Sequence, residues 1–418
     1  MVSIIYQVGM IAKKYSKTRL LVVDDMLVHR EMLNRLLTKE KYSVTLAVNG
    51  SEALEIMKKE KFDLVLLDVE MPEINGFEVC NVMRGDSVLK EIPVIFITSY
   101  GQIENKISGF GIGAQDFITK PFNNRELLVR INTHLLLKHK SDVIKNMNFT
   151  LESKNKSITQ SIEYSRYILQ ALLPSFKNLD KLIPEKFLFF KSREIIGGDF
   201  YWFKQFGPKL YIAATDCTGH GVPGALMSVL GISLLNEVVN DHFFYSPNEI
   251  LNRLRQKVIK ALTRKNEALY NNDGMDMAMC LIDFENMKLQ YSGANIPLFI
   301  LRKDAGRNTY EIIKRPPDRM PIGNHPSSKI SFMNHYIDLC EEDRVYLFTD
   351  GYSSQFGGEI NKTYKTKRLV ELLRNIQGYS LKEQKAFLEK NLLDWKGDNI
   401  QVDDILIMGL QISRKRFT

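Results

Sequence analysis

The stretch Leu64-Val65-Leu66-Leu67-Asp68 is an apolar run that ends in a carboxylate, and it decides the fold of the first part of this 418-residue chain. Similar short apolar runs occur at 20–23, 44–47 and 94–97, and stretches with helical spacing separate them. Strands that are apolar throughout are buried on both faces, which is typical of a parallel sheet covered by helices. The region from Arg19 to about Leu137 is therefore predicted to be an α/β domain.

The composition of the whole chain limits the classes of protein it can belong to. It is 44% hydrophobic and 25% charged, as in ordinary folded proteins, and its length suggests two or three domains. We find no run of eighteen apolar residues and no signal-peptide pattern, so neither a membrane span nor a secretory signal is predicted. The net charge of +8 comes from dispersed lysines, and no nucleic-acid-binding motif accompanies them.

Cysteine usage points to a reducing compartment. The four cysteines lie far apart and form no C-x-x-C pair; they are Cys80, Cys217, Cys280 and Cys340. A disulfide framework or a zinc site is therefore not expected, and a cytoplasmic location is the natural interpretation.

A long helical segment follows the α/β region. From Arg125 to about Leu173 the chain has almost no glycine or proline, and Pro174 ends the segment. Apolar residues recur in it every seven positions, with Met147 between them: Leu137, Ile144, Leu151 and Ile158. Because Lys154, Ser161 and Ser165 interrupt this seam, we predict a modest dimeric coiled coil, with a single surface helix as the alternative.

The pattern beyond Pro184 changes to strands joined by longer connections. Strands are predicted at 188–190, 210–214, 277–282, 288–292, 298–301, 345–348 and 405–410. Helices are predicted to start near Pro223 and Ser246, and others to lie between Lys367 and Trp395. Strands paired locally with helices in groups favour an α+β layered domain.

Carboxylates stand where two strands of the first domain end. Asp24 and Asp25 follow the first apolar run, and Asp68 follows the run at 64–67. Ligands of an open parallel sheet bind at the carboxyl ends of its strands, and three acids gathered there favour a bound Mg²⁺. Thr98 and Lys120 follow later strands, where a hydroxyl and an ammonium could hold phosphoryl oxygens.

This region resembles the receiver domains of response regulators, which implies a doubly wound, flavodoxin-like fold. The blocks that carry the resemblance are Val23-Asp24-Asp25, Leu67-Asp68-Val69-Glu70-Met71-Pro72, Asn75-Gly76, Thr98-Ser99 and Lys120-Pro121-Phe122. It implies that a sensor histidine kinase phosphorylates Asp68. The Mg²⁺ ligands it implies are Asp24, Asp25, Asp68 and the backbone carbonyl of Glu70.

The same resemblance assigns the switch residues of the receiver. Lys120 and Thr98 would contact the phosphoryl group, and Phe117 stands at the position of the aromatic switch residue. Pro121 is expected to follow a cis peptide. His29 and His134 are expected to be solvated or packed helix residues without a role.

Acids in the C-terminal half stand at strand ends beside glycines. They are Asp199, Asp216, Asp350 and the neighbouring pair Asp403 and Asp404. Carboxylates without a Cys/His set suit Mg²⁺ or Mn²⁺, and two such ions can clamp a phosphate and activate a water molecule. A catalytic serine or cysteine nucleophile is then not required.

This half resembles PPM-type phosphatases of the SpoIIE/RsbU branch, which have a β-sandwich flanked by helices. The blocks that carry the resemblance are Gln170–Pro174, Gly197–Trp202, Asp216–Gly224, Tyr291–Asn295, Met320–Gly323, Leu347–Gly351 and Gln401–Ile405. It implies that Asp216 bridges two Mn²⁺ or Mg²⁺ ions, with the Cys217 carbonyl on one and Asp350 and Asp403 on the other. Asp199 would support the first ion, and Asp404 is the alternative to Asp403.

Three residues near these blocks have no firm role. The histidine that follows the bridging acid by two positions in animal relatives is Thr218 here. His220 is interpreted as a turn residue rather than a general acid. Arg193 is expected in a surface ion pair, with phosphate binding as the alternative.

Other functions fit the sequence less well. The turn Gly197-Gly198-Asp199-Phe200 also resembles that of diguanylate cyclases, but Phe200 stands where that motif needs an acid. A catalytically silent docking protein in a partner-switching pathway is the alternative from another class. A DNA-binding regulator is disfavoured, since no recognition helix follows the receiver.

We therefore predict an N-terminal extension at 1–18, a receiver domain at 19–137, a coiled-coil linker at 138–175 and a phosphatase domain at 176–418. The predicted function is metal-dependent dephosphorylation of phosphoserine or phosphothreonine, regulated by phosphorylation of Asp68. The resemblance implies a STAS-type anti-sigma-factor antagonist as substrate. A homodimer through the linker is expected, and neither nucleic acid nor membrane is expected as a partner.

Overall fold

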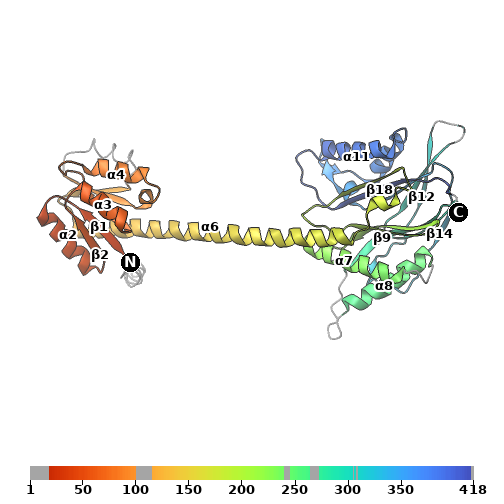
Figure 1. Ribbon diagram of the computed structural model, residues 1–418, viewed down its shortest axis with the longest axis horizontal. Coiled ribbons are helices and arrows are strands. Elements are labelled where there is room, and N and C mark those ends of the chain that lie inside the picture. Colours follow the sequence, from red (N-terminus) through yellow and green to blue (C-terminus); the bar gives the residue numbers. More distant parts are fainter. Residues whose placement is uncertain are drawn as a thin grey trace. The chain divides into compact units, whose positions relative to one another are not determined.

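The computed structural model describes residues 18–99, 115–239, 245–263, 273–304, 306 and 309–415. Contacts divide the chain into two compact units, Met1–Asn155 and Lys156–Thr418. Figure 1 labels the helices and strands of each unit.

The first unit is built on a parallel sheet of five strands in the order β2-β1-β3-β4-β5. Its strands are β1 (Arg19–Val23), β2 (Ser43–Ala47), β3 (Leu64–Asp68), β4 (Val94–Ser99) and β5 (Asp116–Lys120). Its helices are α2 (Leu27–Lys39), α3 (Gly50–Lys59), α4 (Gly76–Gly85), the short 3-10 helix η1 (Leu89–Glu91) and the start of α6 (Asn124–Leu172). The predicted α/β fold is confirmed.

Helices cover both faces of this sheet, as its fully apolar strands require. On one face, Val65 and Leu67 of β3 pack with residues of α3 and α4, among them Met57 and Val79. On the other face, the alternate residues of β1 and β3 pack with Leu33 of α2 and with the first turns of α6. The helices cover the faces of the sheet, and the acids Asp24, Asp25 and Asp68 stand at the carboxyl ends of its strands.

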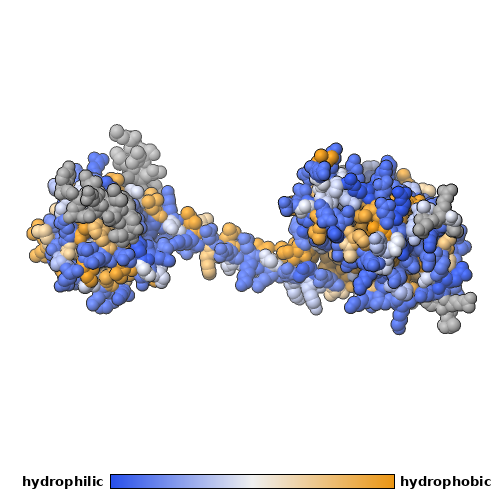
Figure 2. All heavy atoms as spheres, turned by 90° about the horizontal axis from the view of Figure 1, so that it is seen from above, coloured by the Kyte–Doolittle hydropathy of each residue, from blue (hydrophilic) through white to orange (hydrophobic). Residues whose placement is uncertain are grey.

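Helix α6 runs without a break over 49 residues. Leu127 and Ile131 at its start are buried in the first unit, and Leu169 near its end is buried in the second. The seam residues Leu137, Ile144, Met147, Leu151 and Ile158 are 55–66% exposed, and Figure 2 shows apolar side chains among the polar ones along this segment. The predicted long helix is confirmed, and its pairing into a coiled coil stays a prediction.

The second unit contains two main antiparallel sheets. One has six strands, β14-β10-β9-β8-β7 with β13 beside β9, and the other has five, in the order β12-β11-β15-β18-β6. The strands of the first are β7 (Phe200–Phe206), β8 (Lys209–Cys217), β9 (Gly274–Asp283), β10 (Lys288–Ala294), β13 (Ile322–Gly323) and β14 (His335–Asp338). Those of the second are β6 (Lys186–Lys191), β11 (Leu298–Lys303), β12 (Tyr310–Arg315), β15 (Arg344–Phe348) and β18 (Ile405–Gln411).

Helices flank the two sheets to give a four-layered sandwich (Figure 1). The flanking helices are α7 (Gly221–Val238), α8 (Pro247–Leu262), α10 (Thr366–Asn375) and α11 (Leu381–Lys396). Smaller elements are η2 (Phe176–Leu179), α9 (Gly351–Ser354), β16 (Phe356–Gly357) and β17 (Lys362–Thr363).

The strand period explains why the layers form. Leu210, Ile212 and Ala214 of β8 pack in the core between the sheets, whereas Tyr211 and Ala213 pack under α7 and α8. On the second sheet, alternate residues of β15 and β18 pack under α10 and α11. A sheet buried on both faces in this way has apolar residues at consecutive positions.

Helix α7 is, among the described residues, the helix long and apolar enough to cross a membrane. Half of it is buried, and Ile232 and Leu235 belong to the core beneath the first sheet. Its apolar composition is therefore explained by its packing as a core helix.

Candidate functional site

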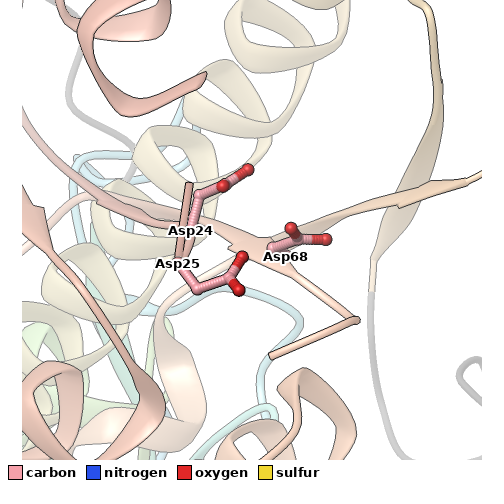
Figure 3. Close-up of side chains that lie close together, drawn as sticks. All are labelled: Asp24, Asp25 and Asp68. Atoms are coloured by element: carbon pink, nitrogen blue, oxygen red, sulfur yellow. The ribbon is translucent and has the colours of Figure 1, made fainter. Parts of the chain in front are cut away.

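Three carboxylates gather at the carboxyl edge of the first unit's sheet. Asp24 and Asp25 follow β1, and Asp68 is the last residue of β3. One oxygen from each lies within 4.8 Å of the others, and Figure 3 shows the three side chains together. Asp24 and Asp68 are buried and Asp25 is exposed, so the group has an opening to solvent.

Lys120, at the end of β5, neutralises part of this negative charge. Its Nζ donates to Asp68 Oδ2 at 2.7 Å and to Asp24 Oδ2 at 2.9 Å. Burial raises the pKa of Asp68, Lys120 lowers it and the charge of Asp24 raises it, and the net result is a rise from 3.8 to about 6. Burial among acids with a single cation makes this a place where a second cation is favoured.

The other residues expected at this site lie around the acids. Thr98 is buried on β4, next to β5 in the sheet. The backbone N–H of Glu70 donates to Asp68 Oδ1 at 3.3 Å, and the ring of Phe117 packs on Phe96 with centroids 5.3 Å apart. The Lys120–Pro121 peptide is cis, as predicted.

His29, expected to be a solvated or packed helix residue, is half-buried on helix α2 and lies beside these acids. Its Nδ1 is 3.2 Å from Asp24 Oδ2 and 3.1 Å from Lys120 Nζ. Sequence patterns missed it because a histidine five residues after Asp24 shows no periodic signal, and the contact with Lys120 spans 91 residues. His134 contacts Asp116 at 3.2 Å, away from these acids.

The acids of the second unit gather around the end of β8. Asp216 lies there directly opposite Asp276 of β9. Alternation along the strands puts both carboxylates on the same sheet face as Ala214 and Ala278, whose side chains face the core between the sheets. Burial, together with the charges of Asp350, Asp403 and Asp276, raises the pKa of Asp216 from 3.8 to about 8.

Two of these acids come from the second sheet. Asp350 follows β15 and Asp403 precedes β18, which is the neighbour of β15. The pKa of Asp403 is raised by burial, and the charge of Asp350 adds to this effect. The ends of two facing sheets therefore bring together four acids from four different strands or their flanks.

Asp404 has a different position from Asp403. It is buried, its Oδ1 accepts from the Arg193 N–H at 2.7 Å, and its Oδ2 accepts from the Gly198 N–H at 2.6 Å. A Cβ on Gly197 would lie 2.4 Å from the same carboxylate. Because backbone donors occupy both oxygens of Asp404, the geometry favours Asp403 as the metal ligand.

Asp199 follows the turn that Asp404 holds. It is buried and accepts from the Thr349 hydroxyl at 2.6 Å. Burial raises its pKa well above 3.8, and the charge of Asp216 adds to the rise. Thr349 precedes Asp350, so a single hydrogen bond ties the acids of the two sheets together.

The loop after Asp216 packs tightly on the Gly197–Gly198 turn. A Cβ on Gly198 would lie 2.7 Å from the Gly219 carbonyl oxygen and 3.2 Å from that of Cys217. Cys217 itself is buried, and burial raises the pKa of its thiol well above 9.0. His220 is exposed and pairs with Glu194 at 2.6 Å, and the Arg193 side chain forms no ion pair among the described residues.

Asp276 is the acid that the sequence patterns missed. It accepts from the Asn295 side-chain amide at 2.8 Å, and burial raises its pKa, with the charge of Asp350 adding to the rise. The sequence signal for it was an acid within an otherwise apolar strand. The strand register places this acid directly opposite Asp216, which identifies it as part of the group.

Both groups of acids fit divalent cations with oxygen ligands. Within the described parts of the chain, the first group is the one that brings three carboxylate oxygens within 4.8 Å. The acids of the second unit are spread more widely, and a pair of cations requires more space than a single one.

Comparison with known families agrees with the two units. The response regulator receiver domain matches residues 20–132, and the stage II sporulation protein E (SpoIIE) family matches residues 207–413. The chain therefore joins a response-regulator receiver domain to a SpoIIE-family domain.

Individual relatives match one domain each. The transcriptional regulatory protein YvrH of Bacillus subtilis is 39% identical over 32% of this chain and 56% of its own length. The probable transcriptional regulator ycf27 of Porphyra purpurea is 43% identical over 28% of this chain and 48% of its own length. The chain thus spans about half the length of these curated relatives.

A solved structure resembles the second unit. The SiaA-PP2C domain of Pseudomonas aeruginosa is 28% identical, with a TM-score of 0.55, and the match covers 62% of this chain and 98% of that one. The β-sandwich flanked by helices is thus a PP2C fold, as predicted from the sequence.

Proposed function

We propose that this chain is a metal-dependent phosphatase of phosphoserine and phosphothreonine proteins, controlled by phosphorylation of Asp68. The observation that carries the catalytic part is the convergence of Asp216, Asp276, Asp350 and Asp403 at the ends of two facing sheets. Burial, together with repulsion from the neighbouring acids, raises the pKa of Asp216 to about 8, and bound cations would relieve the repulsion.

The cations in question are two Mn²⁺ or Mg²⁺. Asp216 would hold both, the Cys217 carbonyl and Asp199 would serve one, and Asp350 and Asp403 the other. When bound, such a pair clamps phosphate oxygens and lowers the pKa of a water molecule between them.

The remaining residues of the site keep the acids in place. Asp404 fixes the turn before Asp199 through two backbone N–H groups. Thr349 holds Asp199 through its hydroxyl. Glycines at 197 and 198 let these backbones approach closely enough for the acids to share one space.

The first unit supplies the regulatory site in this proposal. Asp68 accepts a phosphoryl group from a sensor histidine kinase, with Mg²⁺ held by Asp24, Asp25, Asp68 and the Glu70 carbonyl. Lys120, already 2.7 Å from Asp68, and Thr98 would hold the phosphoryl oxygens. Phe117 would follow Thr98 as the switch residue.

Three further parts of the proposal rest on the family and on α6. The substrate is a STAS-type anti-sigma-factor antagonist, the chain is cytoplasmic, and two chains pair through the exposed apolar seam of α6. The seam supports pairing because its residues are more than half exposed in the single chain.

Phosphate release from a phosphoserine protein tests the catalytic part. We expect turnover with Mn²⁺, none with EDTA, and a loss of at least about 100-fold in Asp216→Asn. Cys340→Ser, an exposed site outside the acid group, serves as the control. Absence of turnover with any divalent metal would support the docking-protein alternative.

A further inference from the structure

The second unit contains a basic pocket that no part of the proposed mechanism uses. It has a volume of about 660 Å³ and lies between the β16–β17 hairpin, the start of α10 and the end of α11. Four cations and two acids line it: Lys362, Lys365, Lys367, Arg368, Glu359 and Glu371. Together with Trp395 and Tyr364, these six residues form the basic pocket.

The cations of the basic pocket are available to a ligand. Lys362, Lys365 and Lys367 are exposed, and within the described residues none of them pairs with a carboxylate. Arg368 is fixed differently, with its guanidinium 4.4 Å from the ring centre of Trp395 and 5.5 Å from that of Tyr364. The pocket therefore holds an excess of positive charge, and the rings of Trp395 and Tyr364 form one of its walls.

The start of α10 adds to this positive charge. Its first turn has no acid, and its N-cap, Lys365, offers no side-chain hydrogen bond to the free N–H groups. Helices normally place acids at this end because the helix dipole is positive there. Basic residues in that turn cost stability, which an anionic ligand would restore.

Hydrogen bonds connect the basic pocket to the catalytic acids. Trp395 Nε1 donates to the Gln355 carbonyl at 3.1 Å. The buried Gln355 side chain in turn donates to the Ile400 carbonyl at 3.0 Å and accepts from the Val402 N–H at 3.2 Å, directly before Asp403. The pocket and the metal-binding loop therefore belong to one hydrogen-bonded unit.

Exposed apolar side chains stand in the two segments of chain that join the acids to the basic pocket, one from Asp350 to Lys362 and one from Trp395 to Asp403. Phe356, Ile360 and Ile400 are 44%, 69% and 76% exposed. The Gln355 side-chain amide donates to the carbonyls of both Phe356 and Ile400, so these residues are neighbours. In both segments an exposed apolar side chain therefore separates a catalytic acid from the basic pocket along the chain.

We propose that the basic pocket docks an acidic segment of the phosphoprotein substrate, while an apolar side chain of that substrate covers Phe356 and Ile400. This deepens the proposed phosphatase function and rests on it. Charge complementarity selects the occupant, because a phosphoprotein with acidic residues near its phosphoserine matches the order of charges on this surface. The metal site removes the phosphate, and the pocket selects among phosphoproteins.

A pair of matched phosphoserine peptides tests this proposal. Both carry an apolar residue after the phosphoserine, followed by glutamates in the acidic peptide and by glutamines in the neutral one. At low ionic strength we expect kcat/KM to be about five- to tenfold higher for the acidic peptide, and the preference to fall with added salt. The double variant Lys362→Gln/Lys367→Gln should lose the preference while its kcat/KM for nitrophenyl phosphate stays within about twofold of the parent. An unchanged preference in that variant overturns the proposal.

Lys382→Gln is the matched control, since Lys382 is an exposed lysine at the opposite end of α11, about 20 Å from Trp395 at 1.5 Å per residue. It should keep the preference. Direct binding of a labelled, unphosphorylated acidic peptide provides a readout independent of turnover. If the wild-type protein binds this peptide and Lys362→Glu does not, the docking site stands even if phosphate release fails; equal binding by both refutes the site.

Discussion

Asp216 is the residue on which the charge balance of the second unit depends. Its carboxylate faces Asp276 across β8 and β9, and burial with the surrounding acids raises its pKa to about 8. Since a cation binds the ionised form, binding below that pH must displace a proton.

The apparent affinity for Mn²⁺ should therefore depend on pH. We expect the association constant to rise up to about tenfold per unit as pH approaches 8 and to level off above it. Calorimetric titrations between pH 6.5 and 9, in two buffers of different ionisation enthalpy, measure both the constant and the released protons. An affinity that does not change over this range would contradict the assignment of Asp216.

Replacement of Asp276 tests its electrostatic effect on Asp216. Asp276→Asn removes one of the negative charges that raise the pKa of Asp216, so the pH at which the Mn²⁺ affinity levels off should fall. The Asn295 amide can still donate to the new side chain's oxygen, which limits structural change. The same calorimetric titration measures this pH. If it is the same in Asp276→Asn and in the parent protein, Asp276 does not act on Asp216.

Asp403 and Asp404 should respond to substitution in opposite ways. Asp403→Asn should reduce metal-dependent phosphate release at least about 100-fold and leave the free energy of unfolding nearly unchanged. Asp404→Asn places an amide against two backbone donors and should cost on the order of 2 kcal/mol in unfolding free energy. Urea unfolding followed by tryptophan fluorescence measures the free energy of unfolding, and Asp398→Asn at an exposed position is the control. If Asp403→Asn unfolded more easily and Asp404→Asn lost activity instead, the roles assigned to the two acids would be exchanged.

Sequence patterns predicted the acids that stand beside glycines or at strand ends, such as Asp68 and Asp216. The choice of Asp403 over Asp404 came from the family resemblance, and the sequence could not give its physical reason because the partners of Asp404 lie 206 and 211 positions away. They missed Asp276 because its significance depends on strand register, which composition does not reveal.

Among the elements, strands with continuous apolar runs were predicted well, whereas the edge strands β7 and β12 were missed. β3 and β18 are buried along almost their whole length and were found. β7 was missed because its aromatic residues were assigned to a motif, and β12 because its exposed edge position weakens the apolar pattern. The packing of the two sheets on one another, which positions the acids, depends on contacts between residues that are far apart in sequence.

The seam of α6 makes a prediction about assembly. Ile144→Asp with Leu151→Asp should convert a dimer to a monomer, because both side chains are 57% exposed in the single chain and would be buried by pairing. Lys154→Leu, which repairs the seam, should strengthen the dimer. Light scattering coupled to size exclusion measures both, and Asn146→Asp outside the seam is the control. A chain that is monomeric before any substitution would refute the pairing.

The whole molecule contains two chemistries, each in a unit of its own. Asp68 lies among the acids of a receiver domain, and Asp216 among those of a SpoIIE-family domain. The central claim is that a phosphoryl group on the first changes the rate at the second. Such control requires that the phosphoryl group favour one of two states that differ in phosphatase rate.

The most direct measurement is phosphate release from a phosphoserine protein by the full chain with Mn²⁺, before and after addition of beryllofluoride with Mg²⁺. Beryllofluoride stands in for the phosphoryl group on Asp68. The account predicts a change in rate of at least about threefold, in one direction, that disappears in Asp68→Ala while the basal rate of that variant remains. A rate that beryllofluoride leaves unchanged, or changes equally in Asp68→Ala, would contradict control by the receiver.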